Sequence, residues 1–369
     1  MDGISAPVFN AFMQIRYNYT VTNDFNGYAF DYNTLNWFGS ECGKTGAMLL
    51  FTLEPDEGFD GLTDVHYAQV ADALTMINQK YSVPVLLRFA HEMNGNWCTY
   101  CLKPTAFKDN FRRMANLIRA RTNMTAMVWG PNVGIAYPFS DVRPDIPTPT
   151  AANNPDFAIL DTNANGIIDP LDDPYTPFYP GDDVVDWVAL SVYNYPLKGC
   201  YNCAVPPTFF HDYLTGTGDV LQYVVGNNWN NPAFAKVHDF YAMFSADTVH
   251  QKPLMIPESG APYGPLWTAN QAGATKPVVD ENTIKAGWWN QILSQTTLQS
   301  YPKLKLVTNY EDQKVQDVFQ TNQPTIQDWK VTNTSSQLSM WKPLIKGFSA
   351  YLPQSQDLKY GCDGSVTLS

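Results

Sequence analysis

Short apolar runs rich in β-branched and aromatic residues alternate with amphipathic helical stretches along this chain. The apolar runs lie at residues 47–53, 83–89, 126–129, 187–193, 253–256 and 304–308. The helical stretches, with apolar side chains three or four residues apart, lie at residues 64–81, 105–121 and 283–298. Such alternation predicts a parallel sheet, and strands that are apolar throughout predict that both of its faces are covered. We expect eight such units to close into a (β/α)8 TIM barrel, with a doubly wound sheet as the alternative.

One long stretch interrupts the alternation. Residues 133–180 are rich in Pro, Asp and Asn, and we interpret them as an insertion in a barrel loop. The first 45 residues are less regular, with at most two strands, at 8–11 and 13–17. Because no linker separates two large domains, we expect one barrel domain over residues 1–369.

The charge balance limits the partners of this chain. It has 23 Lys and Arg against 35 Asp and Glu, a net charge of −12, which argues against nucleic acid and anionic membranes. Aromatic residues make up 14% of the chain and charged residues only 16%. That composition suits a neutral, hydroxyl-rich ligand such as a polysaccharide. No apolar run reaches the roughly 18 residues that a membrane span needs, and we expect a monomer.

Three glycosylation sequons begin at Asn18, Asn123 and Asn333, and the chain has an even count of six cysteines. The start, Met1-Asp2-Gly3, is not a signal peptide. We expect a secreted glycoprotein whose signal has been removed or replaced.

Two glutamates follow buried strands directly. Glu92 lies in the run Arg-Phe-Ala-His-Glu-Met-Asn-Gly-Asn-Trp from Arg88 to Trp97, and Glu258 comes just after residues 253–256. In a barrel, the carboxyl ends of the strands hold the active site. Two carboxylates in one pocket are what glycosidic hydrolysis requires: one gives a proton to the leaving oxygen, and the other attacks the anomeric carbon or activates water. Arg88 and His91 beside them would separate the two pKa values.

The chain here resembles glycoside hydrolase family 26, whose best-known members are β-mannanases. The resemblance rests on ordered stretches at residues 88–97, 128–132, 179–194 and 253–260, within roughly 47–345. It implies a retaining (β/α)8 barrel with the acid/base on strand four and the nucleophile on strand seven. On this sequence these are Glu92 and Glu258, and no cofactor takes part in catalysis.

The resemblance also implies supporting residues. Arg88 would lie beneath Glu258 and lower its pKa, Tyr193 would hydrogen-bond the nucleophile, and His91 would hydrogen-bond within the site. Trp97 would wall a sugar subsite. Two further aromatic residues are candidates for sugar binding, namely Trp267 in a loop and Tyr310, which stands with Asn309 near the place where many members carry a tryptophan.

The resemblance also bears on the substrate. We expect an endo-β-1,4-mannanase, with β-1,3-xylan or mixed-linkage β-glucan as alternative substrates. The nucleophile is flanked as Pro257-Glu258-Ser259-Gly260, which departs from the more frequent family pattern. A barrel that binds polysaccharide without cleaving it is the alternative of another class.

Residues 161–172 fit a calcium loop. Oxygen-bearing side chains stand at its positions 1, 3, 5, 9 and 12, the carbonyl of Ile167 stands at position 7, and Gly166 allows the sharp turn. The expected ligands of a structural Ca²⁺ are Asp161, Asn163, Asn165, Ile167, Asp169 and Asp172. The alternative is a turn rich in Asp and Asn that binds no metal.

The cysteines form two C-x-x-C pairs, Cys98 with Cys101 and Cys200 with Cys203, and leave Cys42 and Cys362. In a secreted protein we favour three disulfides, Cys98–Cys101, Cys200–Cys203 and Cys42–Cys362. A zinc site built from the two pairs is the alternative.

Overall fold

The computed structural model describes residues 6–18, 28–140, 146–194, 202–217, 238–246, 249–264, 278–316, 325–347, 358–360 and 366–368. Of the cysteines and candidate site residues named from the sequence, Cys200, Trp267 and Cys362 lie outside these ranges.

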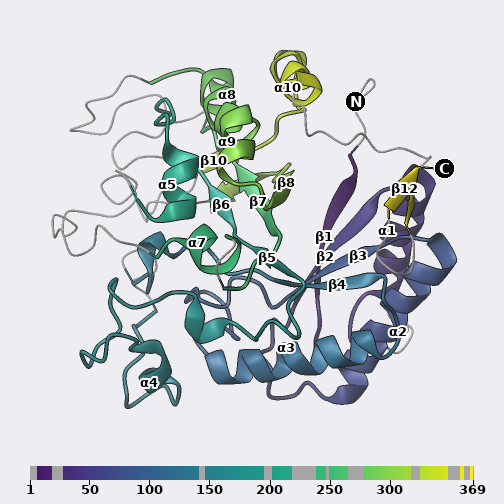
Figure 1. Ribbon diagram of the computed structural model, residues 1–369, viewed down its shortest axis with the longest axis vertical. Helices are drawn as coiled ribbons and strands as arrows, with labels where there is room; N and C mark the ends of the chain where they lie inside the picture. The colour runs from purple at the N-terminus through teal and green to yellow at the C-terminus, as the bar shows by residue number, and fades with distance from the viewer. Residues whose placement is uncertain are drawn as a thin grey trace.

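A curled parallel sheet forms the centre of the molecule (Figure 1). Its strands pair in the order β1-β2-β3-β4-β5-β7-β6, and β8 pairs with β7. They are β1 (Val8–Gln14), β2 (Met48–Glu54), β3 (Val85–Phe89), β4 (Thr125–Trp129), β5 (Trp187–Ala189), β6 (Val192–Tyr193), β7 (Leu254–Gly260) and β8 (Leu304–Asn309). The sheet is of the (β/α)8-barrel class; within the described ranges, β1 and β8 are not paired with each other.

Strands β5 and β6 are two pieces of one barrel strand. Both pair with β7, and Ser191, one of the two residues between them, forms a bridge to Asn132 beyond the end of β4. Among the described strands counted in this way, Glu92 follows the third and Glu258 lies on the sixth, whereas the family resemblance numbers these strands four and seven. The offset of three strands between them is kept.

Helices pack on the outside of the sheet. Figure 1 shows α1 (Tyr32–Thr45), α2 (Asp64–Tyr81) and α3 (Pro104–Arg119) beside β1 to β4. The second half carries α5 (Phe209–Thr215), α7 (Phe240–Phe244), α8 (Glu281–Ile292), α9 (Gln295–Ser300) and α10 (Ser335–Gly347). None of the described helices combines the length and hydropathy needed to cross a bilayer.

Short elements occupy the loops and the C-terminal part. The insertion holds η2 (Gly134–Ala136), α4 (Phe157–Leu160) and η3 (Thr176–Phe178). Two hairpins follow the barrel strands: β9 (Gln313–Gln316) with β10 (Thr325–Asp328), and β11 (Leu358–Tyr360) with β12 (Val366–Leu368).

The interior of the sheet changes from apolar to polar along the strands. One buried layer takes a residue from each of six strands: Val8, Leu50, Leu86, Val128, Ala189 and Met255. Two positions further on, the same faces carry Asn10, Thr52 and Arg88. Asn10 donates to the carbonyl of Pro257 across the interior at 3.0 Å and accepts from the Thr52 hydroxyl at 3.2 Å. The polar end of the interior is therefore the end at which the two glutamates lie.

Most elements agree with the periodicity of the sequence. The helix predicted at 64–81 has those bounds, and the predicted face of α3 is buried at Phe107, Phe111, Met114 and Ile118. The stretch 283–298 instead forms two helices, because Ser294 caps the start of α9 by accepting from the amide of Thr297 at 3.1 Å. The two short strands expected near the N-terminus are one strand, β1.

Candidate active site

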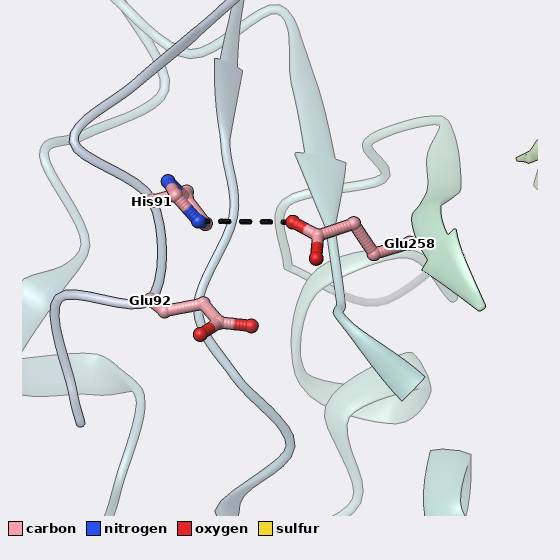
Figure 2. A group of neighbouring side chains, drawn as sticks. All are labelled: His91, Glu92 and Glu258. Carbon is pink, nitrogen blue, oxygen red and sulfur yellow. Dashed lines mark ion pairs between the residues drawn. The ribbon is translucent and has the colours of Figure 1, made fainter. Parts of the chain in front are cut away.

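Two glutamates from distant parts of the chain meet at the polar end of the sheet. One oxygen of Glu92, one oxygen of Glu258 and a ring nitrogen of His91 all lie within 4.8 Å of one another. Figure 2 shows the carboxylates of Glu92 and Glu258 directed into the same space, with His91 facing Glu258. Retaining glycosidases hold their two carboxyl groups about 5–5.5 Å apart, and inverting enzymes about 6.5–9.5 Å apart. Two oxygens within 4.8 Å of each other are closer to the retaining spacing than to the inverting one.

The loop after β3 aims Glu92 by an unusual backbone. Ala90 and Glu92 both adopt positive φ angles, 50° and 54°. The amide of Ala90 donates to Leu53 at 2.9 Å, and the amide of Glu92 donates to Gly130 at 2.8 Å. Because these two backbone hydrogen bonds fix the loop, Ala90 and Glu92 can hold a left-handed conformation that non-glycine residues rarely adopt.

Glu258 is held by buried donors. The guanidinium of Arg88, which is fully buried, makes an ion pair and hydrogen bond with one carboxylate oxygen. The hydroxyl of Tyr193 donates to the other oxygen at 2.8 Å, and Ser191 accepts from Arg88 at 2.6 Å. Burial raises the pKa of Glu258, but the charge of Arg88 and these hydrogen bonds outweigh it and hold the pKa below its usual value. Glu258 is therefore the ionised carboxylate of the pair.

Glu92 has the opposite shift. Burial and the negative charge of Glu258 raise its pKa above the usual value, and the charge of Arg88 opposes this only in part. The side-chain amide of Asn132 donates from Nδ2 to the Glu92 carboxylate at 2.8 Å. Asn94 orients Asn132 through two hydrogen bonds of 2.8 Å. The site thus pairs a carboxyl group of raised pKa with one of lowered pKa, the division that acid catalysis with a nucleophile needs.

His91 lies between two carboxylates without hydrogen-bonding either. Its Nε2 is 3.7 Å from Glu258 and 3.6 Å from Glu54, longer than a hydrogen bond. Burial, together with the positive charge of Arg88, lowers the pKa of His91 to about 3. The ring is therefore neutral and does not cancel the charges around it.

Glu54 is a third carboxylate that the sequence did not single out. It ends β2, and burial and the charge of Glu258 raise its pKa to about 7. The rule that selected Glu92 and Glu258, a glutamate directly after an apolar run, applies equally to Glu54, since the run 47–53 precedes it. Asn132 and Ser191 were also missed as contacts of the glutamates and of Arg88.

The aromatic residues near the two glutamates pack against one another. Trp97 is half-buried, with its ring edge against Phe139 at 4.9 Å. Tyr310 packs edge-on against Tyr193 at 5.9 Å, and Trp329 contacts both rings. Trp329 is 3% exposed, so it supports Tyr193 and presents no free face to a sugar.

Two further tryptophans are buried in the core. Trp129 is fully buried against the rings of Tyr179 and Phe244. Trp288 is buried as well, and its indole N–H donates to Ser259 at 2.9 Å, next to the nucleophile position.

The loop 161–172 folds through its own side chains. Asp161 accepts from the amides of Asn165 and Gly166 at 3.0 and 2.8 Å, and Gly166 has a φ of 89°. Asp172, almost fully buried, accepts from the amides of Asn163 and Asp169 at 3.1 and 2.8 Å.

The donors of this loop fit Ca²⁺ in kind, since it prefers oxygen ligands around such a glycine turn, and Ile167 offers only its carbonyl. However, Asp161, Asp169 and Asp172 do not converge as closely as His91, Glu92 and Glu258 do, the one such group among the described residues.

The predicted disulfide pairing is confirmed in part. Cys98 and Cys101 form a disulfide that closes the loop after Glu92, which excludes zinc binding by that pair. Cys203 is disulfide-bonded as well. The predicted Cys42–Cys362 disulfide is wrong: Cys42 is a free thiol on the inner face of α1, fully buried, with its Sγ facing the carbonyl of Met48 at 3.8 Å.

Comparisons with known proteins bear on the family and on the fold. Residues 52–139, which include Glu92 but not Glu258, match the family model "Glycosyl hydrolase family 26". This match confirms the resemblance over that segment and supports a glycoside hydrolase. No curated protein matches the chain.

Solved structures give a further likeness. A GH26 β-mannanase from Bacteroides ovatus, BoMan26A, is 13% identical with a TM-score of 0.50, over 97% of this chain and 83% of that one. The catalytic domain of the GH26 endo-β-1,4-mannanase of Bacillus sp. JAMB-750 is 14% identical with a TM-score of 0.46, over 95% and 81%. At such identity the likeness to BoMan26A concerns the fold, and it confirms the barrel class.

Proposed function

We propose that this protein is a retaining β-glycoside hydrolase of family 26 type that cleaves internal linkages of the polysaccharide β-1,4-mannan. The observation that carries the proposal is the pair formed by Glu92 and Glu258, with oxygens within 4.8 Å and pKa values shifted in opposite directions. The family match over residues 52–139 supports the same chemistry.

The reaction proceeds by double displacement. The Glu258 carboxylate attacks the anomeric carbon, the glycosidic C–O bond breaks, and Glu92 gives its proton to the leaving oxygen. This forms a glycosyl ester on Glu258. Glu92, now ionised, takes a proton from water as that water attacks the anomeric carbon, and Glu258 leaves as a carboxylate.

The surrounding residues keep each glutamate in its starting state. Arg88 and Tyr193 stabilise the negative charge of Glu258 before attack and after release. Asn132 holds the Glu92 carboxylate in place between its two proton transfers. Because His91 is neutral, it does not lower the pKa of Glu92 by its own charge.

The choice of mannan follows relatives in fold and family, and BoMan26A is a β-mannanase by name. β-1,3-Xylan and mixed-linkage β-glucan are the alternatives, with the same two glutamates. A binding barrel needs no raised pKa at Glu92 and no Arg88–Glu258 pair, so these features favour cleavage.

Release of reducing sugar from mannan, glucomannan, β-1,3-xylan and mixed-linkage β-glucan tests this proposal. Wild type, Glu92→Ala and Glu258→Ala are compared on each polymer. We expect cleavage of mannan that both substitutions remove. A folded wild-type protein that cleaves none of the four polymers would contradict it.

We further propose that the protein acts as a single chain outside the cell, as a glycoprotein. Asn18, Asn123 and Asn333 are all exposed, as oligosaccharide attachment requires, and the Cys98–Cys101 disulfide suits an oxidising compartment. Mass measurement of the protein from its natural source, before and after deglycosylation, tests this.

We also propose a structural Ca²⁺ in the loop 161–172, held by the oxygen atoms predicted from the sequence. The positive φ of Gly166 and the oxygen-only donor set support it. Titration of the metal-free protein with Ca²⁺ in a calorimeter tests it.

A further inference from the structure

We propose that Glu54 and Phe12 form a sugar-binding subsite beside Glu258, where the Glu54 carboxylate accepts hydrogen bonds from sugar hydroxyls and the Phe12 ring packs on the apolar face of the sugar. The inference rests on the proposed function and assigns specificity-determining residues to the same site. Neither residue carries out the bond-breaking chemistry described above.

The strand register places both side chains at the mouth of the barrel. Val8 and Leu50 belong to the buried interior layer. Successive side chains on a strand alternate between faces, so Phe12 and Glu54, each four residues further on, share that inner face. Phe12 pairs with Thr52 in the β1–β2 register, and Glu54 pairs with Gln14 one step nearer the strand ends.

His91 connects the two residues to the nucleophile. The rings of Phe12 and His91 meet edge-on with centroids 5.9 Å apart. Nε2 of the same histidine lies 3.6 Å from Glu54 and 3.7 Å from Glu258. A sugar attacked by Glu258 therefore has Glu54 and Phe12 one side chain away.

Glu54 lacks a hydrogen-bond donor where the other carboxylates have one. Glu258 has Arg88 and Tyr193, and the neighbouring Asp56 has Arg16 at 2.7 Å. Within the described residues, no side chain donates a hydrogen bond to the Glu54 carboxylate. Its side chain is 30% exposed, against 10% for Glu258, so a ligand in the site can reach it.

Sugar hydroxyls are the donors that this arrangement lacks. His91 is neutral and, at 3.6 Å, too distant for a hydrogen bond, so it does not donate to the Glu54 carboxylate. The raised pKa of Glu54, about 7, has the same origin: burial beside Glu258 without a donor. The Phe12 ring is 41% exposed, a large apolar surface next to a carboxylate. A pyranose offers hydroxyls at its edge and C–H groups on its face, which match the two.

Two faces of β1 supply a matched control. Phe9 is 40% exposed and Phe12 is 41% exposed, yet they lie on opposite faces of the same strand, with Phe12 toward His91. Phe9→Ala therefore removes the same apolar area from β1 without touching the site.

The experiment measures binding and turnover separately. Affinity for mannobiose, mannotriose and mannotetraose is measured by calorimetry in a Glu258→Gln background, which prevents cleavage. The substitutions added are Glu54→Ala, Glu54→Gln, Phe12→Ala and Phe9→Ala. KM and kcat on the best polymer are measured with Glu258 intact, and the melting temperature of each variant checks folding.

We expect Glu54→Ala to weaken affinity and raise KM about 10- to 100-fold, since a hydrogen bond to a charged group is lost. Glu54→Gln keeps an acceptor and recovers part of that loss. Phe12→Ala weakens affinity about 3- to 10-fold, the range of one aromatic contact. Phe9→Ala leaves affinity and KM unchanged.

Three results overturn the subsite. They are unchanged affinity in folded Glu54→Ala and Phe12→Ala, a loss of kcat at constant KM, and an equal effect of Phe9→Ala. Each of these presupposes a wild-type protein that cleaves the polymer. A wild type without cleavage or oligosaccharide binding instead contradicts the proposed function itself.

Discussion

The loop after β3 and the loop 161–172 are both rich in polar residues, and the sequence selects both as functional, yet they bond in opposite ways. Residues at the first contact other strands: Arg88 pairs with Glu258, and Glu92 accepts from Asn132. In the second, the carboxylates of Asp161 and Asp172 accept from amides of their own loop.

The difference explains which loop has reactive groups. The carboxylate of Asp172 accepts three hydrogen bonds from its own loop, which fix the shape of a turn. Glu92 and Glu258 lie so close that each alters the charge state of the other, because the fold brings them together. Convergence of groups from separate strands, rather than density of polar residues, marks the site of chemistry.

The largest loss of activity is expected when each catalytic glutamate is removed in turn. Glu258→Ala is expected to lower kcat on the order of 10⁴- to 10⁶-fold, as with loss of other nucleophiles and their partners. Glu92→Ala is expected to lower it about 10²- to 10⁴-fold, the usual contribution of a general acid. An aryl glycoside whose leaving group needs no proton should restore glycosylation in Glu92→Ala but not in Glu258→Ala. Equal rescue of both variants would contradict the two assigned roles.

Tyr193→Phe tests the donors around the nucleophile. Glu258 must be ionised to attack, so activity falls as the pH drops through its lowered pKa. Removing the hydroxyl at 2.8 Å raises that pKa, so the acid limb of kcat/KM should move to higher pH. The rate at the optimum should fall about 10- to 100-fold with the lost hydrogen bond to a charge. An unchanged acid limb would show that the hydroxyl does not act on Glu258.

Asn132→Ala tests the other limb of the pH profile. Glu92 must be protonated to act as the acid, so activity falls as the pH rises through its raised pKa. The Asn132 amide favours the ionised form, and its loss should move the alkaline limb to higher pH. Asn165→Ala in the loop 161–172 is the matched control and should leave both limbs in place. A shift of the alkaline limb to lower pH would contradict the role of Asn132.

The smallest effect on activity is expected from Asp161→Ala and from chelation of Ca²⁺. At about 100 times its Kd, a bound ion stabilises the folded state by about 2.7 kcal/mol. Chelation should therefore lower the melting temperature of the wild type, and Asp161→Ala should abolish the response to Ca²⁺. Because the bonds of this loop stay within it, kcat should not change. A melting temperature that is independent of Ca²⁺ would exclude the ion.

Local periodicity predicts the scaffold better than it predicts the site. The buried strands, α2 and the face of α3 follow from apolar spacing, and Glu92 and Glu258 follow from their place after apolar runs. Glu54 also comes directly after an apolar run, but it lies in none of the stretches that carry the family resemblance, so it was missed. Ser191 was missed because the run 187–193 gives no sign of the break between β5 and β6.

Other contacts depend on tertiary structure alone. Trp329 follows the β9–β10 hairpin, and nothing in its local sequence indicates that it packs against Tyr193. A Cβ on Gly260 would lie 2.7 Å from Cδ1 of Trp329, so a small residue is needed there. Cys42 was assigned a partner by counting cysteines, whereas the inner face of α1 buries it.

The most direct test of the central claim is to trap the covalent intermediate. The protein is incubated with an activated 2-deoxy-2-fluoro-β-mannobioside, and the labelled peptide is identified by mass spectrometry. We expect one glycosyl group per chain, bound to Glu258, and no label in Glu258→Gln. A label on another residue, or mannan cleavage whose first product is the α-anomer, would contradict it.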